Sequence, residues 1–203
     1  MTNHQFTDED RMLINRGIQQ RYAKAAISPQ GVFRYPTGRA GLEGQQYDPE
    51  LIRILPEEVV ASYCGVGNPF SLGSINSGDT VLDVGCGAGV DAIIAGILVG
   101  NKGKVVGIDF VPDMLERARH NLGKTSLTNV EFQQSSAENL DFPDERFDVV
   151  ISNGVMNLIP DKGKAISEIF RVLKLNGRLM VADQILAGEL SMDTKSMVEK
   201  WAG

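Results

Sequence analysis

Beyond residue 79 the chain alternates between short apolar runs and longer segments whose apolar residues recur at helical spacing. The short runs are rich in β-branched residues and predict strands, whereas the longer segments predict helices. Alternating strands and helices favour a parallel sheet wound with right-handed crossovers. The expected strands are 80–84, 104–109, 130–134, 147–152 and 178–183, and the expected helices are 90–99, 112–122, 162–172 and 193–201.

The first part of the chain lacks that alternation. Residues 7–27 carry Ile14, Ile18 and Tyr22 at helical spacing, which predicts a helix with one apolar face. Residues 28–46 are polar and contain glycine and proline, so we expect an irregular connection there.

A second helix is expected over residues 49–60. Asp48 followed by Pro49 is typical of an N-cap and a first helical turn. Pro56 falls inside this helix and predicts a kink. The glycines that follow end the helix, so residues 64–69 are expected to form a loop.

Composition limits the size, partners and compartment of the protein. The 203 residues are 42% hydrophobic and 23% charged, which indicates one globular core. The formal charge of −6 argues against a nucleic-acid partner, because phosphate binding needs a basic face. No apolar run approaches the roughly 20 residues of a membrane span, and the N-terminus lacks a secretory pattern. We therefore expect no membrane partner and a cytoplasmic location.

Cysteine and histidine are scarce. Cys64 and Cys86 do not make a disulfide framework, and no Cys/His pair stands at metal-ligand spacing. We expect no metal site. His4 lies near the terminus and His120 near the end of a surface helix, so both are expected to be solvated rather than to act as a general base.

One motif carries candidate chemistry. The first strand ends in Asp83-Val84-Gly85-Cys86-Gly87-Ala88-Gly89, just before a helix. Glycines at this place let the backbone turn sharply and let a ligand approach the amides. Asp109 ends the second strand, twenty residues past Gly89, where a carboxylate can accept hydrogen bonds from both hydroxyls of a ribose. The alternative is that the glycines only build a tight turn.

The details of this motif distinguish between two kinds of nucleoside ligand. Val90 stands where the dinucleotide fingerprint G-x-G-x-x-G requires its third glycine. Asp83 lies two residues before the first glycine, and its carboxylate would repel a pyrophosphate at this helix N-terminus. A ligand without phosphate and with a cationic end fits instead. S-adenosylmethionine is such a ligand, and a dinucleotide-dependent oxidoreductase is disfavoured.

From about residue 78 to 183 the chain resembles the class I methyltransferases, which use S-adenosylmethionine. Residues 135–138 (SSAE) resemble the family's adenine-binding segment, with Ser136 in place of the usual Asp. Residues 147–153 resemble its fourth strand, whose end meets the methionine part of the cofactor, and 171–179 (RVLKLNGRL) resemble the turn before strand five, with Asn176 or Gly177 at positive φ. The cofactor-binding residues that the resemblance implies are Asp83, Gly85, Cys86, Gly87, Asp109, Phe110, Met114, Ser136, Ala137 and Asn153.

Within that class the chain resembles the arsenite-methyltransferase branch. The resemblance rests on Arg21-Tyr22, on residues 65–69 (GVGNP) and on residues 151–158 (ISNGVMNL). The branch carries arsenic-binding thiolates at positions that match Val66 and either Gly154 or Met156 here, and none of these side chains replaces a thiolate. Cys64 is offset by two residues from the first of them. We therefore expect the scaffold without the arsenic site.

The resemblance implies an α/β fold, a Rossmann-like three-layer sandwich with a parallel sheet of order 3-2-1-4-5. Residues 1–75 are expected to form an N-terminal helical lid and 76–203 the Rossmann-like domain. Tyr22 could belong to the lid or only pack in the core. Asp183 could orient an acceptor or only cap the next segment.

The end of the chain leaves strand five as an expected edge. The family's sheet continues with an antiparallel hairpin, for which residues 184–203 carry no alternating apolar runs. Leu179, Met180 and Val181 would make the edge apolar, and such an edge invites pairing. We expect either a C-terminally truncated chain or an edge covered by the tail or a partner, most simply in a homodimer across strand five.

The functional expectation is an S-adenosylmethionine-dependent methyltransferase acting on a small-molecule acceptor. Two alternatives stay open: a non-catalytic or regulatory S-adenosylmethionine-binding protein, and an arsenite methyltransferase.

Overall fold

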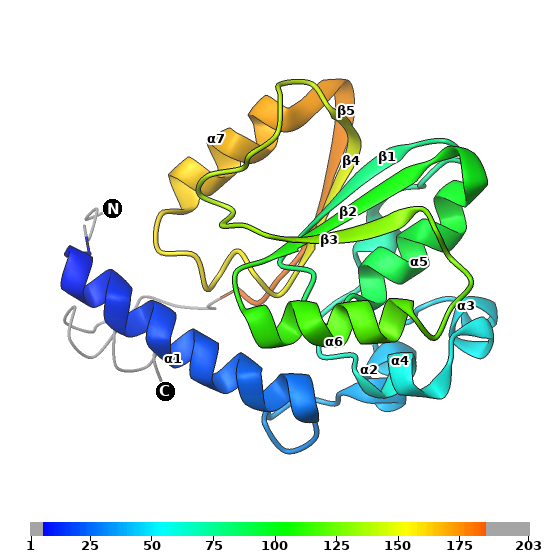
Figure 1. The fold of residues 1–203 in the computed structure, drawn as a ribbon, viewed down its shortest axis with the longest axis horizontal. Coiled ribbons are helices and arrows are strands. Elements are labelled where there is room, and N and C mark those ends of the chain that lie inside the picture. Colours follow the sequence, from blue (N-terminus) through cyan, green and yellow to red (C-terminus); the bar gives the residue numbers. More distant parts are fainter. Residues whose placement is uncertain (1–5, 186–203) are drawn as a thin grey trace.

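The protein is described by a computed structural model over residues 6–185. Its centre is a sheet of five parallel strands in the order β3-β2-β1-β4-β5, which confirms the predicted order (Figure 1). The strands are β1 (Thr80–Val84), β2 (Lys104–Asp109), β3 (Val130–Gln134), β4 (Phe147–Asn153) and β5 (Leu173–Ala182).

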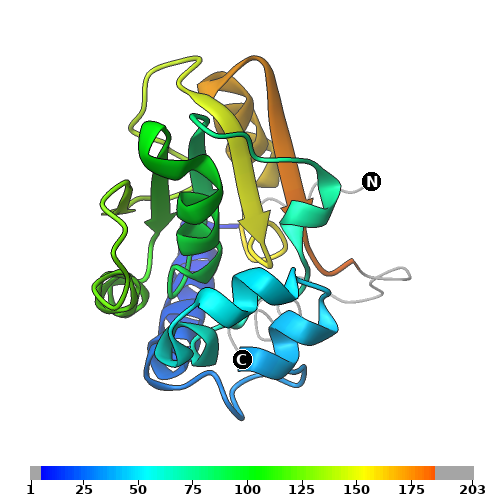
Figure 2. The ribbon, with the colours of Figure 1, turned by 90° about the vertical axis from the view of Figure 1, so that its right-hand side faces the viewer.

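Helices cover both faces of the sheet, which gives the three predicted layers (Figures 1 and 2). Side chains of α5 and α6 pack on one face and those of α7 on the other. The helices are α1 (Asp8–Ile27), α2 (Gly38–Gly44), α3 (Pro49–Ile54), α4 (Glu57–Ala61), α5 (Val90–Val99), α6 (Pro112–Leu122) and α7 (Lys162–Val172), with 3₁₀ turns η1 (Pro69–Leu72) and η2 (Gly100–Lys102).

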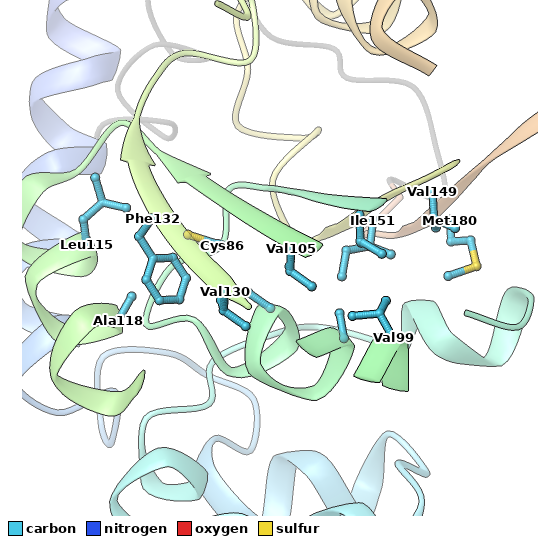
Figure 3. Close-up of a cluster of buried hydrophobic side chains, with 13 residues drawn as sticks. Cys86, Val99, Val105, Leu115, Ala118, Val130, Phe132, Val149, Ile151 and Met180 are labelled. Atoms are coloured by element: carbon cyan, nitrogen blue, oxygen red, sulfur yellow. The ribbon is translucent and has the colours of Figure 1, made fainter. Parts of the chain in front are cut away.

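The pleat of the strands explains how one sheet supports two cores. Successive side chains of a strand point to opposite faces, so Val81 of β1 joins the cluster under α5 while Leu82 joins the cluster under α7. Figure 3 shows the first cluster, in which Val105 and Ile151 of the sheet face Val99 of α5. Strands buried on both faces require continuous apolar runs, which is the pattern that the sequence shows.

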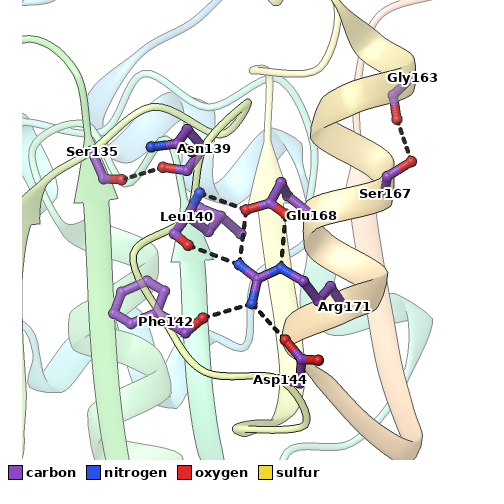
Figure 4. Close-up of polar contacts among 9 residues, drawn as sticks. All are labelled: Ser135, Asn139, Leu140, Phe142, Asp144, Gly163, Ser167, Glu168 and Arg171. Carbon is purple, nitrogen blue, oxygen red and sulfur yellow. Dashed lines mark hydrogen bonds and ion pairs between the residues drawn. The ribbon is translucent and has the colours of Figure 1, made fainter.

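The connection between β3 and β4 has no helix of its own. The guanidinium of Arg171, on α7, donates to the carbonyl oxygens of Leu140 and Phe142, at 2.8 Å and 2.7 Å, and also bonds Asp144 (Figure 4). Glu168, also on α7, accepts from the Leu140 amide at 2.8 Å and from Arg171. Two side chains of α7 therefore bind the backbone of the connection between β3 and β4.

Two expectations for the first part of the chain are wrong in detail. The irregular connection contains the helix α2, because the Gly38 amide donates to the Tyr63 carbonyl at 2.7 Å and Leu42 is fully buried. Packing therefore stabilises a helix in a segment whose high glycine content disfavours one. The single kinked helix is two helices, α3 and α4, because Leu55 before Pro56 is extended at ψ 140° and Pro56 has no amide hydrogen to continue the ladder.

The N-terminal extension shares its core with the sheet domain. Thr7 caps α1 in a capping box with Asp10, and α1 packs along α6. Leu42, Val59 and Tyr63 pack against Ile93 and Ile94 of α5 in one cluster. A boundary at residue 75 stays a prediction.

Strand β5 begins earlier than expected, at Leu173, and Asn176 supplies the positive φ (65°). It pairs only with β4 among the described residues, so it is the outer strand there. Met180 is buried in the α5 cluster and Leu179 packs on the α7 cluster, so these two side chains point to opposite faces of the sheet. The expected helix 193–201 lies outside the described residues, and the homodimer across strand five stays a prediction.

No helix in the described part of the chain combines the length and the apolar character needed to cross a membrane. The cytoplasmic location stays a prediction.

Candidate functional site

A cavity of about 190 Å³ lies at the carboxyl ends of β1, β2 and β4. The turn after β1 and the ends of β2 and β4 form its base. Helix α1 lines one side, and the segment between β4 and α7 lines another. In open α/β sheets this is the edge at which ligands bind.

The glycine turn after β1 contributes backbone to the cavity. Gly85 and Gly87 have positive φ, 71° and 52°, which favours glycine. A Cβ on Gly85 would collide with Val155, whereas a Cβ on Gly87 would meet no atom within 4 Å. Cys86 lines the cavity too, although its side chain packs in the core and its amide donates to the Ile108 carbonyl at 2.8 Å. The turn therefore leaves open space over Gly87 where a ligand can approach the backbone.

Asp109 closes the turn from the end of β2. Its carboxylate accepts hydrogen bonds from the amides of Gly87 and Val111, both at 2.9 Å. Burial raises the pKa of this carboxyl, and hydrogen bonds from the amides of Val111, Gly87 and Phe110 oppose that rise. A carboxylate has about four acceptor positions, so capacity for further donors is left.

Asp83, at the end of β1, is 2% exposed and lines the same cavity. Its Oδ2 has no hydrogen-bond partner among the described residues, while the carboxylate accepts from the Ala92 amide. Burial raises its pKa well above the ordinary value, and the charges of Asp91 and Asp109 raise it further. A buried carboxylate oxygen without a donor is costly, which indicates that a donor or cation binds there.

Asp91 was not among the predicted site residues. It lies in the first turn of α5, lines the cavity and accepts from the Tyr47 hydroxyl at 2.8 Å and the Asn153 amide at 2.9 Å. Burial raises its pKa to about 6, although both hydrogen bonds lower it. One signal pointed to it: it is the only charged residue in the otherwise apolar helix Val90–Val99.

Asn153 is placed at the cavity, but its side chain is engaged with the protein. Its Oδ1 accepts from the amides of Val66 and Gly67, at 2.9 Å and 3.1 Å. Its Nδ2 donates to the Gly67 carbonyl at 2.8 Å as well as to Asp91. Asn153 therefore fixes residues 64–68 against the end of β4, a role that sequence reasoning missed because the partners are far apart in the chain.

The predicted adenine-binding segment lies along another wall. Ser136, Ala137 and Phe110 line the cavity. The Ser136 hydroxyl accepts from the Glu138 amide at 3.2 Å, which holds the segment in a local turn. Glu138 in turn accepts from Arg11 of α1 at 3.2 Å, so this wall is tied to the helix across the cavity.

Tyr22 of α1 also lines the cavity, and its ring packs on Phe33 with 5.7 Å between centroids. Burial raises its pKa well above the ordinary value. Tyr22 therefore both packs on Phe33 and lines the cavity, and its role in a lid stays a prediction.

Two of the candidate residues do not line the cavity. Met114 is fully buried among Ala25, Ala26 and Ala88, so it packs behind the cavity wall instead of lining it. Asp183 accepts from the amide of Asn157 at 2.9 Å, which makes it a cap for the loop after β4 and not part of the cavity lining.

A parallel sheet of order 3-2-1-4-5, a glycine turn after its first strand and an acidic residue ending its second define the class I methyltransferase fold. The chain belongs to the methyltransferase domain family, whose model matches residues 75–202. The predicted resemblance to this class is confirmed.

Similar proteins include two kinds of methyltransferase. The arsenite methyltransferase of Halobacterium salinarum is 32% identical over 97% of this chain and 54% of its own length. The ubiquinone/menaquinone biosynthesis C-methyltransferase UbiE of Escherichia coli is 42% identical over 54% of this chain and 44% of its own. The crystal structure of an arsenic(III) S-adenosylmethionine methyltransferase from Chlamydomonas reinhardtii matches with a TM-score of 0.56 and 35% identity, over 73% of this chain and 50% of that one. The chain spans about half the length of the curated relatives it matches.

Proposed function

We propose that this chain binds S-adenosylmethionine in the cavity and transfers its methyl group to a small-molecule acceptor. The observation that carries the proposal is the Oδ2 atom of Asp83, buried without a partner at the end of β1 beside the glycine turn. S-adenosylmethionine has a cationic ammonium and sulfonium and no phosphate. An anionic, glycine-lined cavity fits that ligand, whereas it would repel a pyrophosphate.

The residues present fit each part of the cofactor. The carboxylate of Asp109 keeps acceptor capacity for a ribose hydroxyl beyond its bonds to the amides of Gly87, Phe110 and Val111. The open side of Gly87 admits the methionine end close to the backbone. Ser136 and Ala137, with Phe110 opposite, would hold the adenine.

The bound cofactor would supply an electrophilic methyl group. The chain contributes positioning and the exclusion of water, which can supply about 7–11 kcal/mol of a barrier when the reacting atoms are well aligned. Helix α1, with Tyr22, lies along the cavity for this purpose. Asn153 acts indirectly, by holding the loop that contains Val66 against β4.

Arsenite is a second candidate acceptor, favoured by the arsenite methyltransferases among the relatives. A specific contact argues against it. Val66 lies against Gly154, since a Cβ on Gly154 would be 3.2 Å from a methyl group of Val66. Val66 and Gly154 are therefore neighbours without sulfur, and the thioether of Met156, the other candidate for the second position, does not replace a thiolate. The cysteines of the chain are Cys64, at the cavity, and Cys86, in the cofactor turn.

The test is a screen for S-adenosylhomocysteine release with phenols, amines, thiols, carbon acids and arsenite with a thiol reductant. We expect release with an organic acceptor and none above background with arsenite. Methylated arsenicals at steady turnover would overturn the choice of acceptor. Tight cofactor binding with no release in any arm would support the non-catalytic alternative instead.

A further inference from the structure

The charges that line the cavity have one sign. The described lining residues include the carboxylates of Asp83, Asp91, Asp109 and Glu138, and they include no lysine, arginine or histidine. The first three are at most 9% exposed, so solvent screens them poorly. The cavity is therefore strongly anionic when these groups are ionised.

The nearby basic residues do not change that balance. Arg11 stands at the rim, where Glu138 at 3.2 Å and Asp161 at 3.9 Å neutralise it. Arg119 is not a lining residue, and its guanidinium donates to the Phe132 carbonyl at 3.1 Å. Lys162, beside the lining, donates to the carbonyl oxygens of Asn157 and Ile159 at 3.3 Å and 2.8 Å, so its ammonium is engaged by the backbone.

The part of the lining beyond the proposed cofactor residues is mostly apolar. Ile18 and Tyr22 come from α1, and Leu158, Ile159 and Pro160 come from the segment after β4. Asn15 is the exposed polar residue of α1 at this end of the lining. An acceptor that enters here meets an apolar wall on both sides and carboxylates at the base.

From this arrangement we infer that the acceptor is an uncharged or cationic molecule with an apolar body, and that carboxylate, phosphate and sulfate acceptors are excluded. The inference rests on the proposed function. The single net positive charge of the cofactor would be offset by these carboxylates, so no net positive charge would be left to attract an anion. Neutral and cationic molecules would bury apolar surface without that repulsion.

The test uses three aromatic probes of similar shape and different charge: 4-ethylphenol, tyramine and 4-hydroxyphenylacetate. Each is titrated into the free chain and into the chain saturated with S-adenosylhomocysteine, with binding followed by NMR or calorimetry. We expect 4-ethylphenol and tyramine to bind at least ten-fold more tightly than 4-hydroxyphenylacetate in both states. Equal or tighter binding of 4-hydroxyphenylacetate would overturn the inference, and so would the failure of all three probes to bind.

A matched pair of variants tests the role of the cavity directly. Asn15→Arg places a cation in the lining, and we expect it to strengthen binding of 4-hydroxyphenylacetate at least five-fold. Gln19→Arg is the control, because it adds the same charge one turn further along α1, on an exposed residue outside the lining. It should change the affinity for 4-hydroxyphenylacetate less than two-fold. Equal effects of the two variants would contradict the inference. S-adenosylhomocysteine is titrated into the chain before the probes are added. If S-adenosylhomocysteine does not bind, that result counts against the proposed function alone and not against the inferred class of acceptor.

Discussion

The side-chain amide of Asn153, at the end of β4, donates a hydrogen bond to Asp91 Oδ2 in the first turn of α5 at 2.9 Å. The same side chain accepts from the amides of Val66 and Gly67. One residue therefore joins a strand, a helix and the loop before η1, all at the edge of the cavity. A disturbance at this residue should affect both the fold and the site.

Asn153→Ala is expected to lower the free energy of unfolding by about 2–3 kcal/mol, because it leaves two backbone amides without their acceptor. For a chain of this size that corresponds to a fall in Tm of roughly 4–12 °C, measured by thermal denaturation. The exposed Asn101 provides the control, and Asn101→Ala should melt with the unaltered protein. A melting point of Asn153→Ala within a degree of that value would show that the network does not stabilise the fold.

Arg171→Lys is expected to destabilise the connection between β3 and β4. A lysine cannot reproduce the planar fork that donates to Leu140 and Phe142 together, so at least one carbonyl loses its donor. We expect a loss of about 1–3 kcal/mol in chemical denaturation. Arg16→Lys, on the exposed side of α1, serves as the matched control. If both variants unfold at the same denaturant concentration, the guanidinium of Arg171 does not stabilise the connection between β3 and β4.

Cofactor binding is expected to weaken as the pH falls through 6. Burial raises the pKa of Asp91 to about 6 and that of Asp83 well above its ordinary value, so below pH 6 the free cavity holds protons. A cationic ligand favours the ionised carboxylates and must expel those protons. Affinity should therefore fall by about ten-fold from pH 7 to pH 5 for one such proton. Calorimetry in two buffers of different ionisation enthalpy should show proton release at pH 5.5 and almost none at pH 8, and the absence of release at both would refute the ionisation of this site.

Backbone exchange should report whether α1 acts as a lid. A cofactor enclosed in the cavity beside α1 would stabilise the helix, so amide exchange in residues 11–25 should slow when S-adenosylmethionine is added. Amides of α7, which covers the other face of the sheet, should exchange at an unchanged rate. Identical exchange of α1 with and without cofactor would mean that it only packs on α6.

The strands and helices from residue 80 to 172 can be predicted from sequence because glycine, proline and apolar periodicity separate them. The glycine turn and Asp109 can be predicted for the same reason, since both follow directly from the ends of strands. The burial of Met114 outside the cavity lining could not be predicted, because spacing alone does not tell which face of α6 a neighbouring helix covers. Here α1 covers that face with Ala25 and Ala26.

The network around Asp91 could not be predicted from local pattern. Tyr47 lies 44 positions before Asp91 and Asn153 lies 62 positions after it. Only the fold brings them together, and the burial that raises the Asp91 pKa exists only once they meet. Helix α2 is similar, because its glycines disfavour a helix until Leu42 is buried.

The central claim is that this cavity binds S-adenosylmethionine through Asp109. Calorimetric titration of the cofactor into the unaltered protein should show one site per chain, and Asp109→Asn should weaken it about 5- to 150-fold, the equivalent of about 1–3 kcal/mol. Asp113→Asn removes an exposed carboxylate from the first turn of α6 and should leave the affinity unchanged. Equal affinities for the folded Asp109→Asn protein and the unaltered protein would contradict the account.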